Sequence, residues 1–242
     1  PRYVVASGRL AYEPDPGHVQ IQYPTDFPMP PGGLHIRWPD HALDQEARLF
    51  HYKWYAALAY IRANRLNYNV IEGQNDRFGL IASGKAYNDT RQALVDLGLD
   101  DDTCRQLGIR VHKVNVVWPL EATITRDFAQ GLQEILVVEE KRQVIEYQIK
   151  EELYNWPDGK RPRVYGKFDE KDGRGGEWAM PQGQWLLPAM NELSPALIAK
   201  AIGARLLNAG QYASRFGGAL PAEIRRRIET KLIVAILSFD LN

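Results

Sequence analysis

The central part of the chain alternates short apolar runs with longer stretches in which apolar residues recur at helical spacing. The runs that indicate buried strands are 78–83, 109–117 and 134–138. The stretches that indicate helices are one that ends before Gly98, then 100–107, 123–132 and 143–154. Strands separated by helices of this length need crossovers, which are right-handed and join parallel strands. The pattern therefore predicts an α/β fold, a three-layer α/β/α sandwich around a mostly parallel sheet.

The regions on either side follow different patterns. Proline-rich residues 1–44 predict an extended arm with one short strand at 19–23. From Gln45 to Leu66 there is neither proline nor glycine, and the apolar spacing predicts a long amphipathic helix. That helix either packs on its own sheet or contacts another domain. The predicted organisation is an arm at 1–44, an α/β domain at 45–207 and a helical tail or linker at 208–242.

The last third of the chain is less regular. We expect an edge strand at 163–168 and a helix that opens at Ser194-Pro195, with serine as cap and proline in the first turn. The tail contains a further helix, on which Arg225-Arg226-Arg227 is interpreted as a solvated face.

Charge and cysteine content indicate which kinds of partner the chain can have and in which cell compartment it is expected. Lysine and arginine total 30, as do aspartate and glutamate, so neither nucleic acid nor an anionic membrane is expected as the main partner. No segment reaches the roughly 18 apolar residues of a membrane span. The single cysteine, Cys104, excludes an internal disulfide and an iron–sulfur cluster made by this chain alone. A reducing compartment, the cytoplasm, is the expected location.

One stretch resembles a phosphate-binding loop. Residues 79–86 (GLIASGKA) match its spacing, except that Ala86 replaces the hydroxyl residue that holds magnesium. The residues between the two glycines are apolar and belong inside a strand, whereas a true loop turns its amides towards phosphate. A tight turn from strand to helix is therefore favoured, and a stand-alone nucleotide-binding or regulatory module remains the alternative.

Polar and aromatic residues follow two of the predicted strands. The carboxyl ends of parallel strands are where ligands and partners collect. Carboxylates that enter a helix also suit its dipole without any further function, so capping and contact with another domain both remain open. The candidates for a domain interface at these strand ends are Trp118, Glu121, Glu139, Glu140, Lys141 and Arg142.

Other reactive side chains form no recognisable set. The five histidines (His18, His35, His41, His51 and His112) lack metal-ligand spacing. Cys104 has no histidine beside it and is interpreted as a partly buried thiol. No catalytic, cofactor-binding or metal-binding residue is predicted.

Six stretches carry a family resemblance: residues 29–40 (MPPGGLHIRWPD), 45–49 (QEARL), 90–94 (TRQAL), 117–121 (VWPLE), 134–142 (EILVVEEKR) and 150–156 (KEELYNW). Together they resemble the middle of the large, fused indolepyruvate ferredoxin oxidoreductases, members of the 2-oxoacid:ferredoxin oxidoreductase family. The resemblance covers about residues 19–207, and the tail after Gln211 departs from the pattern.

The resemblance implies a domain similar to the transketolase C-terminal domain, placed between the parts that bind thiamine diphosphate. The parent enzyme would convert an aryl pyruvate and coenzyme A to acyl-coenzyme A, carbon dioxide and reduced ferredoxin. It would use thiamine diphosphate, magnesium and iron–sulfur clusters, none of them bound by this fragment. We expect a non-catalytic domain, inactive in isolation, whose partners are the other domains of an oligomeric enzyme.

Overall fold

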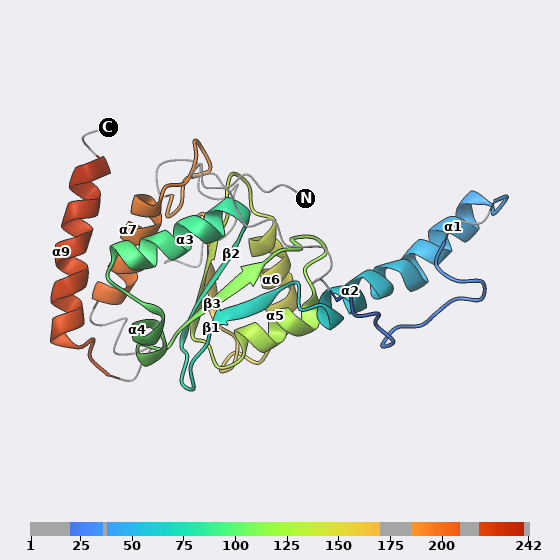
Figure 1. The fold of residues 1–242 in the computed structure, drawn as a ribbon, viewed down its shortest axis with the longest axis horizontal. Coiled ribbons are helices and arrows are strands. Elements are labelled where there is room, and N and C mark those ends of the chain that lie inside the picture. The colour runs from blue at the N-terminus through green and yellow to red at the C-terminus, as the bar shows by residue number, and fades with distance from the viewer. Residues whose placement is uncertain (1–19, 36–37, 170–184, 209–217, 240–242) are drawn as a thin grey trace. The chain divides into compact units, whose positions relative to one another are not determined.

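The computed structural model describes residues 20–35, 38–169, 185–208 and 218–239 and divides into two compact units between Asn67 and Tyr68 (Figure 1). Within the described residues, no helix combines the length and apolar character needed to cross a membrane. The predicted helix from Gln45 to Leu66 belongs to the first unit. The three segments 1–44, 45–207 and 208–242 stay a prediction about domain organisation.

The described part of the first unit is one long helix with an extended strap beside it. The helix consists of α1 (Ala42–Arg48), a π-helical turn η2 (Leu49–Lys53) and α2 (Trp54–Ala63), here called the arm helix. The strap, residues 20–35, is held by Asn64, whose amide donates to Gln22 O and accepts from Gln22 N, both at 2.9 Å. Because the backbone of Gln22 bonds to a side chain, described residues 20–23 form no strand, and that prediction was wrong.

The second unit is built on a five-stranded sheet. Its strands are β1 (Tyr68–Ile71), β2 (Phe78–Ser83), β3 (Ile109–Val114), β4 (Glu134–Val138) and β5 (Arg163–Tyr165), in the spatial order β1-β3-β2-β4-β5. Only β1 is antiparallel to its neighbour among these strands. The predicted mostly parallel sheet is confirmed, and the predicted bounds of β2 and β4 are those observed.

Helices cover both faces of this sheet (Figure 1). They are α3 (Gly84–Asp96), α4 (Asp101–Gln106), α5 (Ala122–Ala129), α6 (Ile145–Leu153), α7 (Pro195–Leu207) and α9 (Ala222–Phe239). Side chains of β2 alternate between two cores: Leu80 packs with residues of α3, α7 and α9, and Ile81 packs with residues of α5 and α6. The predicted three-layer α/β/α sandwich is therefore confirmed.

The tail helix α9 is an integral part of one outer layer. Its Ile228 is fully buried, and a Cβ added at Gly203 of α7 would meet Leu232 of α9 at 3.0 Å. Arg225 donates to Leu207 O, and Arg227 donates to Gly98 O, both at 3.1 Å. These carbonyls end α7 and α3, where a cation is favoured by the helix dipole. The interpretation of Arg225-Arg226-Arg227 as a solvated face therefore holds for the exposed Arg226, whereas Arg225 and Arg227 also bind the ends of two other helices.

A buried ion pair fixes the amino ends of the strands. Arg110 of β3 donates through Nε to Asp76 Oδ2 at 3.0 Å and through Nη1 to Phe128 O at 2.6 Å and Gln130 O at 3.0 Å. Asp76 also accepts from Gly73 N at 2.9 Å. One guanidinium thereby joins the loop between β1 and β2 to the end of α5.

Replacement of this arginine tests how much the ion pair stabilises the second unit. We expect Arg110→Met to lower the free energy of unfolding by about 3 kcal/mol, because it leaves the carboxylate of Asp76 buried without its cation. The matched control, Arg105→Met, removes an exposed pair with Asp102 and should cost less than about 1 kcal/mol. Urea titration of both variants measures the difference, and equal effects would contradict this account.

Candidate functional site

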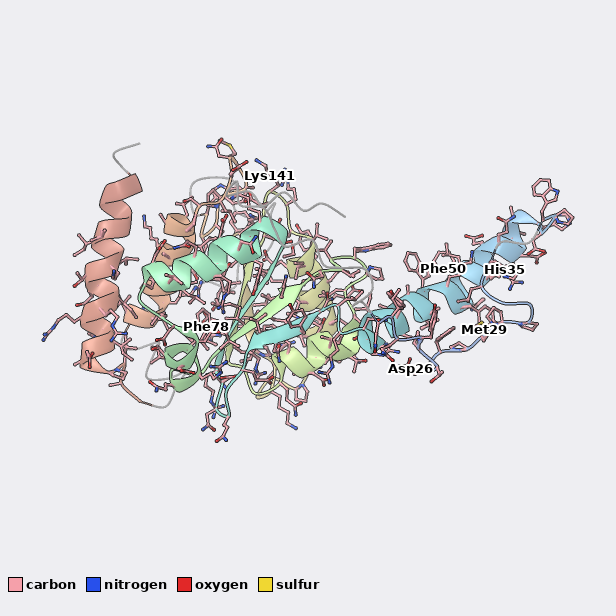
Figure 2. The ribbon with its side chains drawn as sticks, viewed as in Figure 1. Asp26, Met29, His35, Phe50, Phe78 and Lys141 are labelled. Atoms are coloured by element: carbon pink, nitrogen blue, oxygen red, sulfur yellow. The ribbon has the colours of Figure 1, made fainter. Side chains whose placement is uncertain are left out.

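The carboxyl ends of the strands are where an open α/β sheet ordinarily accepts a ligand. The chain leaves β2 towards β3 on one side and returns to β4 on the other, so the strand order reverses between β2 and β4. A crevice at such a reversal is the usual binding position. We call the residues after β2, β3 and β4 at this end the carboxyl edge; Figure 2 labels Lys141 there and Phe78 near the opposite end of β2.

Glu139 at this edge is a capping residue. Its carboxylate accepts from the backbone N–H groups of Val144 and Ile145 at 2.9 Å and of Glu146 at 3.1 Å, which satisfies the first turn of α6. Burial raises the pKa of Glu139, while the three backbone donors act in the opposite direction. With only 6% of its surface exposed, the carboxylate serves its own chain.

A buried lysine lies behind Glu139. Lys167, which is 1% exposed, donates through Nζ to Glu139 O and to Pro188 O, and its backbone N–H donates to Glu146 Oε2 at 3.1 Å. Burial lowers the pKa of the Lys167 ammonium. Gly166 is required beside it, because a Cβ there would lie 2.0 Å from Glu146 Oε2. This cluster connects β4, α6 and the chain that leaves β5.

Glu140 and Lys85 join two strand ends to a covering segment. Lys85 Nζ donates to Asp89 Oδ2 at 2.5 Å and to Leu193 O at 2.7 Å, and it lies 3.4 Å from Glu140 Oε1. Leu193 N donates back to Glu140 at 3.2 Å, and Lys141 Nζ donates to Asn191 O at 2.9 Å. The side chains that could bind a ligand between β2 and β4 therefore already form hydrogen bonds with the segment before α7.

Residues 79–86 do not form a phosphate-binding loop in the structure. Gly79 lies inside β2, paired with Arg110 and Ile135, and a Cβ there would lie 2.6 Å from Leu132 Cδ1. Gly84, with φ of 51°, begins α3 directly after the strand. The favoured interpretation, a strand-to-helix turn, is confirmed.

The loop after β3 supplies one buried and one exposed candidate. Glu121 is 1% exposed and caps α5 by accepting from Ile124 N at 2.7 Å. Trp118, joined to Pro119 by a cis peptide bond, is 59% exposed. Gln148 of α6 holds this loop: its side chain accepts from Leu120 N at 2.7 Å and donates to Val117 O at 2.8 Å.

An exposed apolar patch surrounds that attachment. It consists of Val117, Trp118, Val144 and Tyr147, here called the Trp118 patch. Gln148 also donates to Val144 O at 2.8 Å, so one side-chain amide binds the backbone carbonyls of both valines. Lys141 and Arg142 are exposed at the start of the same helix-entry loop. The structure thus brings Trp118, Lys141 and Arg142 to the surface of the carboxyl edge, while Glu121 and Glu139 lie beneath it.

Two further reactive side chains, Cys104 and His112, are buried in the second unit. Among the described residues, no group of three or more histidine, cysteine, aspartate or glutamate side chains is placed to hold a metal ion. Cys104 is fully buried, and burial raises the pKa of its thiol to about 12. His112 is 1% exposed, with Nδ1 2.7 Å from Asn69 Oδ1. His18 lies outside the described residues.

Several residues of the edge had no signal in the sequence. Lys167, Gln148 and the 191–193 segment act through contacts between elements far apart in the chain, which spacing does not report. A lysine after an edge strand is ordinarily solvated, so its burial could not be anticipated.

Together, the fold and the edge define an α/β/α domain whose strand ends are held by its own side chains and which carries an exposed apolar patch. The chain belongs to the indolepyruvate ferredoxin oxidoreductase middle-domain family, whose model matches residues 67–237. The match begins within one residue of the second compact unit. It also includes most of the tail, which corrects the expectation that the resemblance ends near residue 207.

Curated relatives agree with this assignment. The chain is 32% identical over 105 residues to indolepyruvate oxidoreductase subunit IorA of Thermococcus kodakarensis, which is 43% of this chain and 15% of that subunit. It is 33% identical over 106 residues to IorA of Methanothermobacter marburgensis, 44% of this chain and 16% of that subunit. The match thus spans less than one fifth of the length of these relatives.

A solved structure of 2-oxoglutarate:ferredoxin oxidoreductase from Magnetococcus marinus is also similar, with a TM-score of 0.39 and 12% identity over 69% of this chain and 24% of that one. A split-gene transketolase gives a TM-score of 0.34 and 12% identity over 69% of this chain and 42% of that one. Likenesses this distant carry no further argument.

The cap on α6 can be tested directly. We expect Glu139→Ala to lower the free energy of unfolding by about 2 kcal/mol, because three backbone donors lose their acceptor. Glu192→Ala, which changes a largely exposed carboxylate at the same edge, should cost less than about 0.5 kcal/mol. Denaturant titration checks both values, and a stable Glu139→Ala protein would show that the cap is dispensable.

Acid should destabilise the second unit through His112. Burial, with the charge of Arg110, lowers the pKa of His112 from 6.5 to about 3. Between these values only the unfolded chain binds the proton, so stability falls as pH decreases from 6.5. By pH 5 the loss is about 2 kcal/mol. Comparing the pH dependence of unfolding with His112→Gln isolates this contribution, which should disappear in the variant even though its stability at pH 7 is lower.

Proposed function

We propose that this chain is a non-catalytic organising domain of a thiamine diphosphate-dependent indolepyruvate ferredoxin oxidoreductase. The complete enzyme would convert an aryl pyruvate and coenzyme A to acyl-coenzyme A, carbon dioxide and reduced ferredoxin in the cytoplasm. Membership of the middle-domain family supports the enzyme class. The domain's own part is to pack against neighbouring domains, and it would not turn over 2-oxoacids alone.

The Trp118 patch is the observation that carries this proposal. Exposed apolar side chains gathered around one anchored loop, with charged residues beside them, are typical of an interface that buries its centre and keeps a polar rim. Gln148 fixes the loop before any partner arrives, so little conformational entropy is lost when the patch is covered. Lys141 and Arg142, which the sequence analysis named as interface candidates, provide the polar rim.

Within the part of the chain that the structure describes, the side chains of the carboxyl edge do not fit the cofactors of the parent enzyme. An iron–sulfur cluster needs several thiolates, and the one cysteine here is buried with a raised pKa. The carboxylates of Glu121 and Glu139 are committed to helix caps. We therefore assign thiamine diphosphate, magnesium and the clusters to other parts of the enzyme and derive no step through them.

The alternative, a nucleotide-binding or regulatory module, lacks a comparable observation. A thermal-shift titration with magnesium and ATP or GTP separates the two. Free nucleotide at 100 times the dissociation constant of such a site would raise the free energy of unfolding by about 2.7 kcal/mol. We expect no shift in the unfolding temperature.

The Trp118 patch can be tested in the native protein that contains this chain. We expect that protein to have a mass well above 27.6 kDa and to contain thiamine diphosphate and iron. Trp118→Asp should reduce its indolepyruvate-dependent reduction of ferredoxin about tenfold or more, because a charge enters a buried interface. The control, Tyr154→Asp, changes a more exposed aromatic residue at the other end of α6 and should leave the activity unchanged. A native mass of 27.6 kDa without either cofactor would refute the proposal.

A further inference from the structure

The arm helix exposes apolar side chains that the described residues of its own unit, 20–35 and 38–67, do not cover. Neither α1 nor η2 contains a buried residue. Leu43 is 76% exposed, Phe50 56% and Tyr55 53%. Figure 2 labels Phe50 on this helix, with Met29 and His35 in the chain beside it. A helix with this much exposed apolar surface is typical of one that packs on a partner.

The strap leaves that surface open. Besides the bonds of Asn64, Arg48 Nη1 donates to Gly33 O at 2.8 Å, and Arg62 pairs with Asp26 at 2.6 Å. These contacts hold the strap along the helix by polar groups. They do not bury the apolar side chains that α1 and η2 present, so the strap is not the missing partner.

Charge along the arm helix identifies the partner. Residues 40–47 contain Asp40, Asp44 and Glu46 and no lysine or arginine, whereas residues 53–66 contain Lys53, Arg62 and Arg65 and no aspartate or glutamate. Arg62 already pairs with Asp26 of the strap, so Lys53 and Arg65 are the cations offered to a second copy. Two copies placed antiparallel would bring the acidic end of each beside the basic end of the other. Such an arrangement is self-complementary about a two-fold axis, which is the commonest symmetry of protein dimers.

We propose that the arm helix is a self-association surface, on which a second copy of this chain packs its own arm helix antiparallel. The axis passes close to η2, the middle of the helix, so that Phe50, which shares a helix face with Leu43, lies at the centre of the contact in both copies. Aromatic residues at the centre and complementary charges towards both ends match the usual anatomy of an interface. This deepens the proposed organising role by naming a partner, and it uses residues distinct from the Trp118 patch.

The contact is limited in size, which determines how it should be measured. The helix from Ala42 to Ala63 is about 33 Å long. A single pair of such helices forms an interface at the small end of the known range, so association should depend on concentration. Sedimentation equilibrium of the 242-residue chain from about 1 to 100 μM should show a mass that rises from 27.6 kDa towards twice that value. A monomer throughout would overturn the proposal.

Two substitutions show whether this surface is the one used. Phe50→Asp should raise the dissociation constant about tenfold or more, because it puts a charge at the centre of the contact. Val95→Asp, at a 63% exposed position of α3, is the matched control and should not change it. Circular dichroism of both variants verifies that the monomer remains folded. Dimerisation that persists in Phe50→Asp would place the interface elsewhere and refute this one.

Charge reversal tests the antiparallel arrangement. About an axis through the middle of the arm helix, between Tyr52 and Lys53, Asp44 of one copy lies level with Ile61 of the other, about one helical turn from Arg65. Asp44→Lys and Arg65→Glu should each weaken the dimer about tenfold, since every reversal creates two like-charge encounters. The double variant should recover to within about threefold of the original dissociation constant. Without that recovery the antiparallel geometry is wrong.

Trp118→Asp separates this inference from the proposed function. It should leave the dissociation constant of the 242-residue chain unchanged, because the Trp118 patch lies in the second unit. If Trp118→Asp reduces the activity of the native protein while the 242-residue chain is monomeric, only the self-association is overturned. A dimer that depends on Phe50, in a protein without the cofactors, would overturn only the enzyme assignment.

Discussion

Glu139 makes the contact on which the carboxyl edge depends. Its carboxylate lies under the first turn of α6, and its backbone carbonyl accepts from the buried ammonium of Lys167. A carboxylate and an ammonium would each be costly to bury without such partners. Because both are satisfied, the end of β4, the start of α6, the exit of β5 and the covering segment at Pro188 are fixed relative to one another. The Trp118 patch rests on this same helix through Gln148.

The strands and helices of the second unit were largely predictable because burial on both faces leaves a simple trace in sequence. β2 and β4 are continuous apolar runs, and their helices repeat apolar residues at helical spacing. β1 was missed because its four residues, Tyr68–Ile71, show no run or alternation and pair antiparallel at an edge. Residues 20–23 of the strap were predicted as a strand, but Gln22 forms its backbone hydrogen bonds with the side chain of Asn64, which the local sequence pattern cannot show.

The candidate site was predictable only in part, for a related reason. The positions of Trp118, Glu139, Glu140 and Lys141 at strand ends followed from topology. Whether such a residue faces outward or caps a helix depends on which backbone donors come within reach, and these are fixed only when the segments meet. Glu121 and Glu139 both lie between a strand and the next helix and both cap that helix, whereas Trp118 and Arg142, close to them in sequence, are exposed. Charge at the end of a parallel strand is therefore weak evidence for chemistry until its partners are known.

The two units differ in how their stability can arise. The second encloses two hydrophobic cores, one on each face of its sheet. The first has a helix whose initial half buries no residue and whose strap is held by polar contacts. A single helix without a core gains too little from burial to offset the entropy lost on ordering. Its apolar side chains are most easily explained if another surface covers them. The family match begins at residue 67, so the helix that needs a covering surface lies before the domain that this chain has in common with its family.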